Sequence, residues 1–175
     1  MSHFCSHVWK LLILALIFSC ADGETKFGTK VIASQFAVTL PDYLSPVKNL
    51  NDDAPLQMGN NIQEIYLIAR FNDWKDLRKK HADWEIEDYY DFHIENLLLE
   101  VQEPTAPGPD SVSINGLNAL VGYYEGKLKE DEIYCKLVML ESEKTLYQLL
   151  IWTKKGNLPL YEADMDRIIR SFKEV

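Results

Sequence analysis

The sequence has few of the residues and patterns that would fix a chemistry directly. Only 3 of its 175 residues are cysteine and only 8 are glycine, which excludes a dense disulfide scaffold and a collagen-like chain. There is no low-complexity tract and no internal repeat, which excludes disordered and solenoid architectures. With 47% hydrophobic and 26% charged residues, the composition is typical of one globular domain.

Positive charge is also scarce. The chain has 18 Lys and Arg residues against 27 Asp and Glu residues, a formal net charge of -9. Nucleic-acid-binding surfaces need the opposite sign, so we expect no nucleic-acid partner. The same excess disfavours electrostatic docking on anionic lipid.

Catalytic motifs are absent as well. The sequence contains no Gly-x-Ser-x-Gly elbow and no His-Glu-x-x-His pair. His93 falls on an apolar helical stripe, and His81 is too distant to form a His-x-x-x-His pair with it, so we interpret His93 as a buried, hydrogen-bonded side chain. Cys135 alternates with apolar residues and should be a buried thiol with a raised pKa. We therefore expect no enzyme, no cofactor and no metal centre.

No hydrophobic run is long enough to cross a membrane. Residues 11–18 (LLILALIF) form an unbroken apolar stretch after Lys10, but a membrane-spanning helix needs about 20 such residues. A basic start, a short apolar centre and small residues behind it are typical of a secretory signal. We predict that residues 1–19 are a signal peptide.

The residues around Cys20 indicate how the mature chain begins. Ile17-Phe18-Ser19-Cys20 is similar to a bacterial lipobox, although Phe18 is bulkier than usual. This resemblance implies an acylated Cys20 as the first mature residue, held in the membrane by its acyl chains. Plain secretion is the alternative. Residues 20–30, which are small and polar, should form a lipidated tether.

The rest of the chain, residues 31–175, predicts a single α+β domain. Short turns separate three successive strands near its end, which indicates antiparallel hairpins. The strand at 145–153 is apolar on both alternating sets, so both faces of the sheet should be covered. The pattern predicts an α/β/α sandwich with a central, mainly antiparallel sheet. The expected strands are 35–40, 62–71, 117–126, 131–140 and 145–153, the helices 72–80, 85–101 and 160–173, and the longer loops 45–61 and 102–111.

Several short segments resemble the PsbP-like superfamily. They are 36–41 (FAVTLP), 49–51 (NLN) with Ala54 and Gln57, 65–67 (IYL), 147–153 (YQLLIWT) and 168–174 (IIRSFKE). The resemblance spans residues 32–175 and implies an α/β/α sandwich around an antiparallel sheet. It also implies a binding or assembly role, because most members act in that way. The lipobox-like start is closer in character to uncharacterised bacterial lipoproteins, and no binding residue can be transferred from the family.

The most unusual feature is an acidic segment. Between His81 and Gly126 there is no Lys or Arg, but ten Asp and Glu residues. On the helix at 85–101 the acids lie opposite the apolar stripe, with one aromatic side chain among them. This pattern predicts a surface for a protein partner with a basic face. The alternatives are an ordinary solvated helix face and an aromatic ring packed beneath the proline-rich loop. The candidate residues are Glu87, Asp88, Asp91, Phe92 and Glu95.

Together these features predict a membrane-tethered bacterial lipoprotein with a non-catalytic binding or assembly domain in the cell envelope. We expect it to cross the inner membrane and to be anchored at the periplasmic face or in the outer membrane. The alternative is a carrier for a small ligand or cation, or an envelope enzyme, with its site in an aromatic groove. The aromatic residues that would line that groove are Trp74, Trp84, Tyr89, Tyr123 and Tyr124.

Overall fold

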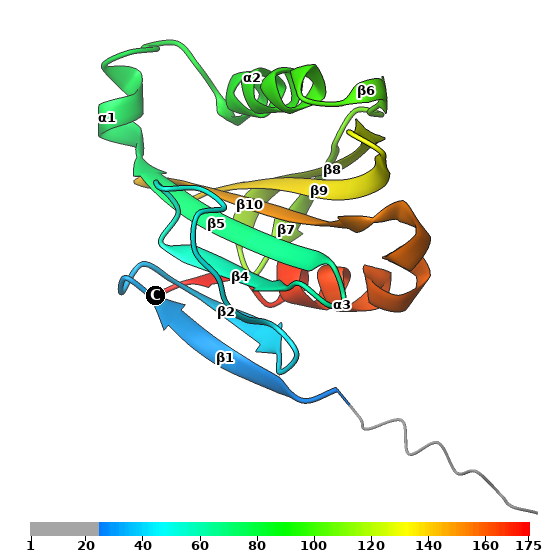
Figure 1. Cartoon of the computed structure of the whole chain (residues 1–175). Helices are drawn as coiled ribbons and strands as arrows, with labels where there is room; N and C mark the ends of the chain where they lie inside the picture. The colour runs from blue at the N-terminus through cyan, green and yellow to red at the C-terminus, as the bar shows by residue number, and fades with distance from the viewer. Residues whose placement is uncertain (1–24) are drawn as a thin grey trace, which may run out of the picture.

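The computed structural model describes residues 25–175, and all the features below belong to that part of the chain (Figure 1). The predicted signal peptide, Cys20 and the first residues of the predicted tether lie outside the described residues. Within them, no helix combines the length and the apolar character that a membrane crossing requires.

An eight-stranded sheet forms the centre of the molecule. Its strands follow the order β3-β4-β5-β10-β9-β8-β6, with β7 also paired to β8, and every pairing is antiparallel. The three predicted strands near the C-terminus are confirmed as β8, β9 and β10. The strands are β3 (Ser45–Pro46), β4 (Leu56–Asn60), β5 (Ile65–Asp73), β6 (Gln102–Thr105), β7 (Asp110–Ile114), β8 (Leu117–Leu128), β9 (Asp131–Glu141) and β10 (Thr145–Lys154).

Two helices cover part of one face of this sheet (Figure 1). The first, α1 (Trp74–Arg78), begins after Asp73, whose carboxylate accepts a hydrogen bond from the Lys75 backbone N–H at 2.7 Å. The second, α2 (Ile86–Leu99), packs mainly on β8, β9 and β6. The apolar side of α2 forms a core with the sheet. That core includes Trp74, Ile86, Tyr89, Tyr90, Ile94, Leu120, Tyr124, Cys135, Leu137 and Met139.

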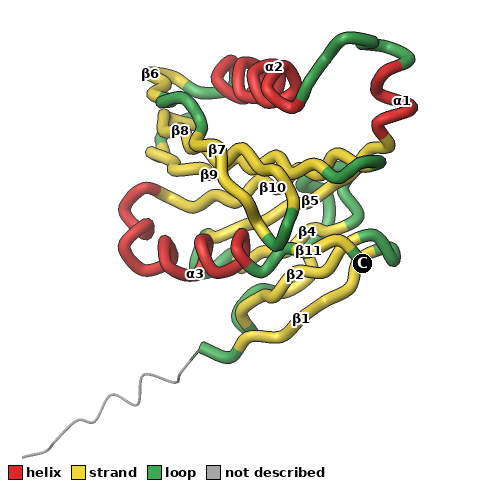
Figure 2. The backbone as a smooth tube through the Cα atoms, turned by 180° about the vertical axis from the view of Figure 1, so that it is seen from behind, coloured by secondary structure: helices red, strands yellow, loops and turns green. Residues whose placement is uncertain are grey.

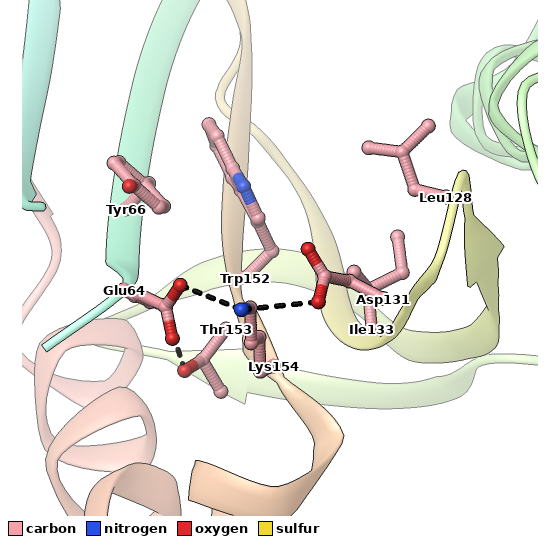
Figure 3. A pocket seen from close by; sticks show the side chains of 8 residues that line it. All are labelled: Glu64, Tyr66, Leu128, Asp131, Ile133, Trp152, Thr153 and Lys154. Atoms are coloured by element: carbon pink, nitrogen blue, oxygen red, sulfur yellow. Dashed lines mark hydrogen bonds and ion pairs between the residues drawn. The ribbon is translucent and has the colours of Figure 1, made fainter.

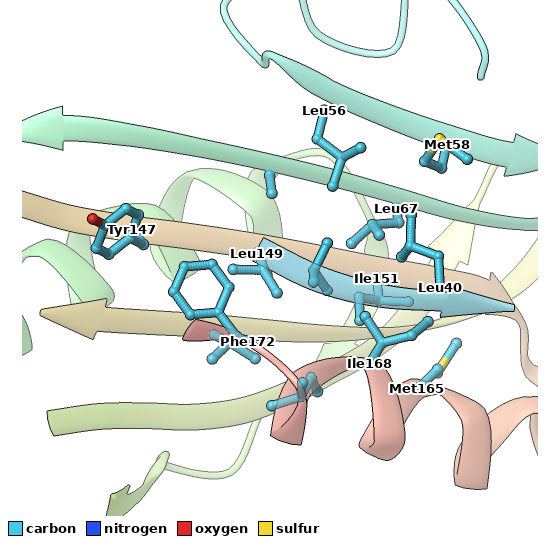
Figure 4. Close-up of a cluster of buried hydrophobic side chains, with 14 of the residues drawn as sticks. Leu40, Leu56, Met58, Leu67, Tyr147, Leu149, Ile151, Met165, Ile168 and Phe172 are labelled. Atoms are coloured by element: carbon cyan, nitrogen blue, oxygen red, sulfur yellow. The ribbon is translucent and has the colours of Figure 1, made fainter. Parts of the chain in front are cut away.

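The other face is covered by helix α3 (Leu158–Arg170) and by a small three-stranded sheet (Figure 2). That sheet has the order β1-β2-β11 and consists of β1 (Phe27–Ile32), β2 (Phe36–Pro41) and β11 (Lys173–Glu174). A single 3-10 turn, η1 (Lys155–Asn157), joins β10 to α3. The predicted apolar stripe of the last helix is confirmed, and its residues pack on β10 (Figure 4). They are Tyr161, Met165, Ile168, Ile169 and, just beyond the helix, Phe172.

The sandwich predicted from β10 is confirmed. Tyr147, Leu149 and Ile151 belong to the core under α3, whereas Leu146, Leu150 and Trp152 face the core under α2. Adjacent residues of a strand point to opposite faces, so an apolar residue at nearly every position needs cover on both sides. Within the described residues, the buried members of the two cores lie between Phe36 and Phe172.

Two predicted loops were wrong. Residues 45–61 contain β3 and β4, and residues 102–111 contain β6 and the first residues of β7. All four strands are short and lie at or near a sheet edge, and in β6 and β7 exposed polar residues also hide the alternation that marks a strand. The predicted tether also overlaps a strand, because residues 27–30 belong to β1, which pairs with β2 and is mostly exposed.

Candidate functional site

The structure places all five predicted partner-binding residues on the outer surface of α2. Glu87, Asp88, Asp91, Phe92 and Glu95 are exposed, while the opposite side of the helix is buried in the core. Glu87, Asp91 and Glu95 are spaced by four residues and are therefore neighbours along one line of the helix. We call this group of five residues the α2 surface.

The carboxylates of the α2 surface form no ion pair with any Lys or Arg within residues 25–175. Elsewhere in the acidic segment the charges are partly neutralised. Lys127 lies 2.8 Å from Glu103, and Lys155 lies 2.6 Å from Glu125. The α2 surface thus keeps its negative charge.

Asp88 differs from the other acids because it has a structural role. The Asp88 Oδ2 accepts a hydrogen bond from the Glu85 backbone N–H at 2.8 Å. In return, the Glu85 side chain accepts a hydrogen bond from the Asp88 backbone N–H. This reciprocal pair is a capping box, which satisfies N–H groups that the first turn of a helix leaves unpaired. Its negative charge also lies at the positive end of the helix dipole. Asp88 therefore fixes the start of α2, in addition to any contact with a partner.

Phe92 is the exposed end of an aromatic cluster. Its side chain is 47% exposed, and its ring lies 5.6 Å from that of Trp84. Trp84 in turn stacks on His81 at 3.8 Å and meets Tyr89 at 4.8 Å. The ring is therefore supported by Trp84 and is not buried beneath the proline-rich segment. A partly exposed aromatic residue held by its neighbours loses little side-chain entropy on binding.

The predicted aromatic groove does not form as one site. Trp74, Trp84 and Tyr89 cluster near the start of α2, and Tyr124 lies in the same core. Tyr123 points to the opposite face of the sheet, where it stacks on Tyr134 with ring centroids 5.3 Å apart. Tyr123 and Tyr124 are neighbours in β8, and the alternation of side chains along a strand separates them.

The core under α2 contains a thiol whose pKa is raised and two hydroxyls without a hydrogen-bond partner in the described chain. Cys135 is fully buried, as predicted, and burial raises the pKa of its thiol to about 12. The hydroxyls of Tyr89 and Tyr90 are buried and have no hydrogen-bond partner in the described part of the chain. Burial also raises the pKa of Tyr90, to about 12.

A polar cluster borders α2 on the sheet, and we did not predict it. The Nε–H of Arg70 in β5 donates to the Oε1 of Gln148 in β10, and its Nη2 lies 3.1 to 3.2 Å from the ring nitrogens of His93. Burial lowers the pKa of Arg70, and burial together with Arg70 lowers the pKa of His93 to about 4. His93 is partly buried and hydrogen-bonded, in agreement with its predicted role. Arg70 is the only Lys or Arg in the predicted strand at 62–71, and this isolated positive charge was the sequence signal for the cluster.

A small hollow lies at the opposite end of the same two strands (Figure 3). It encloses about 170 Å³. Tyr66 and Trp152 stack at its side with ring centroids 5.3 Å apart. Lys154 Nζ lies 2.7 Å from Glu64 Oε1 and 3.0 Å from Asp131 Oδ1, so one cation bridges two carboxylates. Among residues 25–175, no three His, Cys, Asp or Glu side chains are grouped to hold a metal ion.

Solved structures show which fold this is. Cyanobacterial PsbP (CyanoP) from Synechocystis matches with a TM-score of 0.60 over 91% of this chain and 99% of that protein, at 12% identity. LpqN, described as involved in cell envelope biogenesis of Mycobacterium tuberculosis, matches with a TM-score of 0.56 over 88% and 93%, at 10% identity. A putative regulator from Pseudomonas aeruginosa matches with a TM-score of 0.52, at 12% identity. No protein-family model and no curated protein sequence matches the chain.

The domain therefore has the PsbP-like fold, and the resemblance noted in its short segments is confirmed at the level of architecture. At identities of 10–12% the likeness concerns the fold alone. The role of the chain has to be argued from its own surfaces.

Proposed function

We propose that this chain is a membrane-anchored lipoprotein of the bacterial cell envelope, and that its PsbP-like domain binds a protein partner through the α2 surface without catalysing a reaction. The observation that carries the proposal is the combination on one helix face of unpaired carboxylates and the partly exposed ring of Phe92. Unpaired acids attract a basic surface, and an aromatic ring among them supplies apolar contact area.

The position of the N-terminus supports the proposal. Strand β1, the first element after the predicted anchor, lies on the side of the molecule opposite α2 in both views (Figures 1 and 2). Residues 21–26 would separate an acylated Cys20 from Phe27, a reach of at most about 25 Å when extended. An anchored domain would thus direct the α2 surface away from the bilayer, where its negative charge avoids anionic lipid. The anchor would also raise the concentration of the domain near a partner in the same envelope.

The anchor is tested on its own by mass spectrometry of the N-terminus purified from native membranes. We expect a mature chain that begins with an acylated Cys20, and we expect Cys20→Ser to move the protein into the soluble fraction. An unmodified chain that retains Met1 in the membrane-free fraction would contradict the anchor.

The partner surface is tested by crosslinking in native membranes followed by co-purification. The variant should carry Glu87→Lys, Asp91→Lys and Glu95→Lys and should leave Asp88 intact, because Asp88 caps the helix. We expect the reversal to abolish enrichment of a reproducible basic partner, since attraction becomes repulsion.

A matched control reverses three other exposed acids that form no ion pair in the described chain, Asp52, Glu130 and Glu162. It changes the net charge by the same amount but leaves α2 untouched, so it should keep the partner. If both triple variants lose the partner equally, net charge and not the α2 surface governs binding. Phe92→Ala should also weaken capture of the partner, but with little change in its salt dependence, because the ring contributes apolar contact and no charge.

A further inference from the structure

Arg70 is a partly buried cation without a counterion. Its two hydrogen-bond partners, Gln148 and His93, are both neutral, and no carboxylate of the described residues lies within ion-pairing distance. Asp53 is the one acid whose charge raises the pKa of Arg70, and it is exposed and forms neither an ion pair nor a hydrogen bond with Arg70. The Nη1 atom of Arg70 has no hydrogen-bond partner within residues 25–175.

This arrangement is costly unless a bound anion completes it. Removing a cation from water without an opposite charge destabilises the folded state. The chain has 27 acidic residues, so a carboxylate partner would be easy to supply, yet the neighbouring positions hold an amide and an imidazole. Gln148 is buried and orients the guanidinium without neutralising it. A guanidinium held in place with its charge uncompensated is suited to bidentate recognition of a carboxylate.

An apolar lane continues from Arg70 along β5 and β10. The antiparallel register pairs Arg70 with Gln148, then Ile68 with Leu150, then Tyr66 with Trp152. These six residues share one face of the sheet, because they alternate along each strand. Helix α2 packs mainly on β8, β9 and β6, which leaves Tyr66, Leu150 and Trp152 partly exposed. The lane is about 13 Å long from Arg70 to Tyr66 and ends at the hollow beside Lys154 (Figure 3).

We infer that this lane is a binding site for a monocarboxylic acid with an apolar body, the class to which medium-chain fatty acids belong. The carboxylate would pair with Arg70, and the apolar body would lie over the partly exposed Leu150, beside the buried Ile68, towards the stacked rings of Tyr66 and Trp152. One end of the lane is cationic and its floor is apolar, which matches the two ends of such a ligand. The inference uses none of the residues of the α2 surface, so it stands independently of the proposed partner.

The test is an NMR titration of the purified full chain with octanoate, acetate and octyltrimethylammonium. We expect octanoate to shift the Arg70 Nε–H, the Gln148 side-chain amide and the backbone amides of Leu150 and Trp152, with saturation. Acetate should shift only the Arg70 end and bind at least tenfold more weakly, because it lacks the apolar body. The alkylammonium should leave the lane unshifted, because it shares the tail but reverses the charge.

Two variants separate the site from nonspecific binding. Arg70→Gln should weaken octanoate binding at least tenfold, whereas Arg170→Gln, an exposed arginine on the other face, should not change it. Unshifted resonances of the α3 core report that each variant is folded, and the ligand series on the unmodified chain decides the question if Arg70→Gln does not fold. Equal binding of octanoate and the alkylammonium, or shifts confined to Lys75, Lys79 and Lys80 in and just after α1, would overturn the inference.

Discussion

The two faces of the central sheet are built differently. The face under α3 is closed by a helix and a three-stranded sheet. It holds four aromatic rings, each with its centroid within 6.5 Å of at least two of the others, those of Phe36, Phe71, Tyr147 and Phe172. The face under α2 has a smaller core, a charged cluster at its border and a lane along β5 and β10 that is only partly covered. One face is built for stability, and the candidate binding features all lie on the other.

The two long helices show the same contrast. Helix α3 buries four residues on one stripe, and its Asp166 forms an ion pair with Lys136 of β9. Helix α2 begins with a capping box that stabilises it locally, and its outer acids form no ion pair in the described chain. A helix that is stabilised by its own cap can carry a surface that does not serve the fold.

The largest effect should come from the α3 face. Phe172→Ala removes a fully buried ring that stacks on Phe36 at 5.1 Å and meets Tyr147 at 5.1 Å. We expect a loss of about 3–5 kcal/mol in the free energy of unfolding. Urea denaturation followed by circular dichroism measures it. A loss below about 1 kcal/mol would show that this face is not the main source of stability.

A steric test comes next, on the α2 face. A Cβ at position 122 would lie 1.9 Å from the Tyr90 hydroxyl oxygen, so Gly122→Ala should cost about 1–3 kcal/mol. Tyr90→Phe removes a buried hydroxyl that has no partner in the described chain, so alone it should be neutral or slightly stabilising.

The double variant sharpens this test. If the clash is with the hydroxyl, Gly122→Ala combined with Tyr90→Phe should recover at least half of the loss, measured as a double-mutant cycle in urea. A strictly additive pair would place the strain elsewhere in β8.

A smaller effect should appear on the acid side of neutrality. The pKa of His93 is lowered to about 4 in the folded chain, so the unfolded chain takes up the proton first as the pH falls. The stabilisation is complete above pH 6.5 and is lost between 6.5 and 4. Allowing for partial solvent exposure, we expect His93 to account for about 1 kcal/mol of the loss between pH 7 and pH 5.

Urea midpoints at these two pH values measure the contribution, with His93→Asn as the comparison. The variant should lose less stability on acidification than the natural chain. Arg70→Gln should reduce the acid loss in part, because Arg70 is the second cause of the shift after burial. If the unfolding free energy of all three chains depends on pH in the same way, the cluster of Arg70 and His93 does not contribute to the acid loss of stability.

The smallest effects should come from the acids of α2. Asp88→Ala removes one half of the capping box and should cost about 1 kcal/mol. Glu87→Ala, its neighbour on the exposed surface, should change the unfolding free energy by less than about 0.5 kcal/mol. Thermal unfolding of the two variants separates an acid that serves the fold from one that is free to serve a partner.

Sequence reasoning succeeded where a side-chain period extended over many residues. The apolar steps of α2 and α3 and the doubly apolar β10 predicted the layers, and the short turns predicted antiparallel neighbours. It failed at β3, β4, β6 and β7, which are too short to show a clear period, although β4 and β7 each pair with the next strand along the chain. Edge strands carry little of the alternation that periodicity detects.

The candidate sites divide in the same way. The outward direction of Glu87, Asp91, Phe92 and Glu95 followed from helical geometry, because residues on one helix are placed by the 3.6-residue period alone. The predicted aromatic groove failed because its members came from different elements.

By itself, the sequence determined the layered α+β architecture, the buried state of Cys135 and the acidic outer surface of α2, since each depends on local period and composition. Only the tertiary structure brought Arg70, His93 and Gln148 together, because position 93 is 23 residues from position 70 and 55 from position 148 along the chain. Only the tertiary structure left Tyr66, Leu150 and Trp152 of the lane partly exposed. Contacts between distant segments depend on which strands pair and where a helix comes to lie, and no local pattern records that choice.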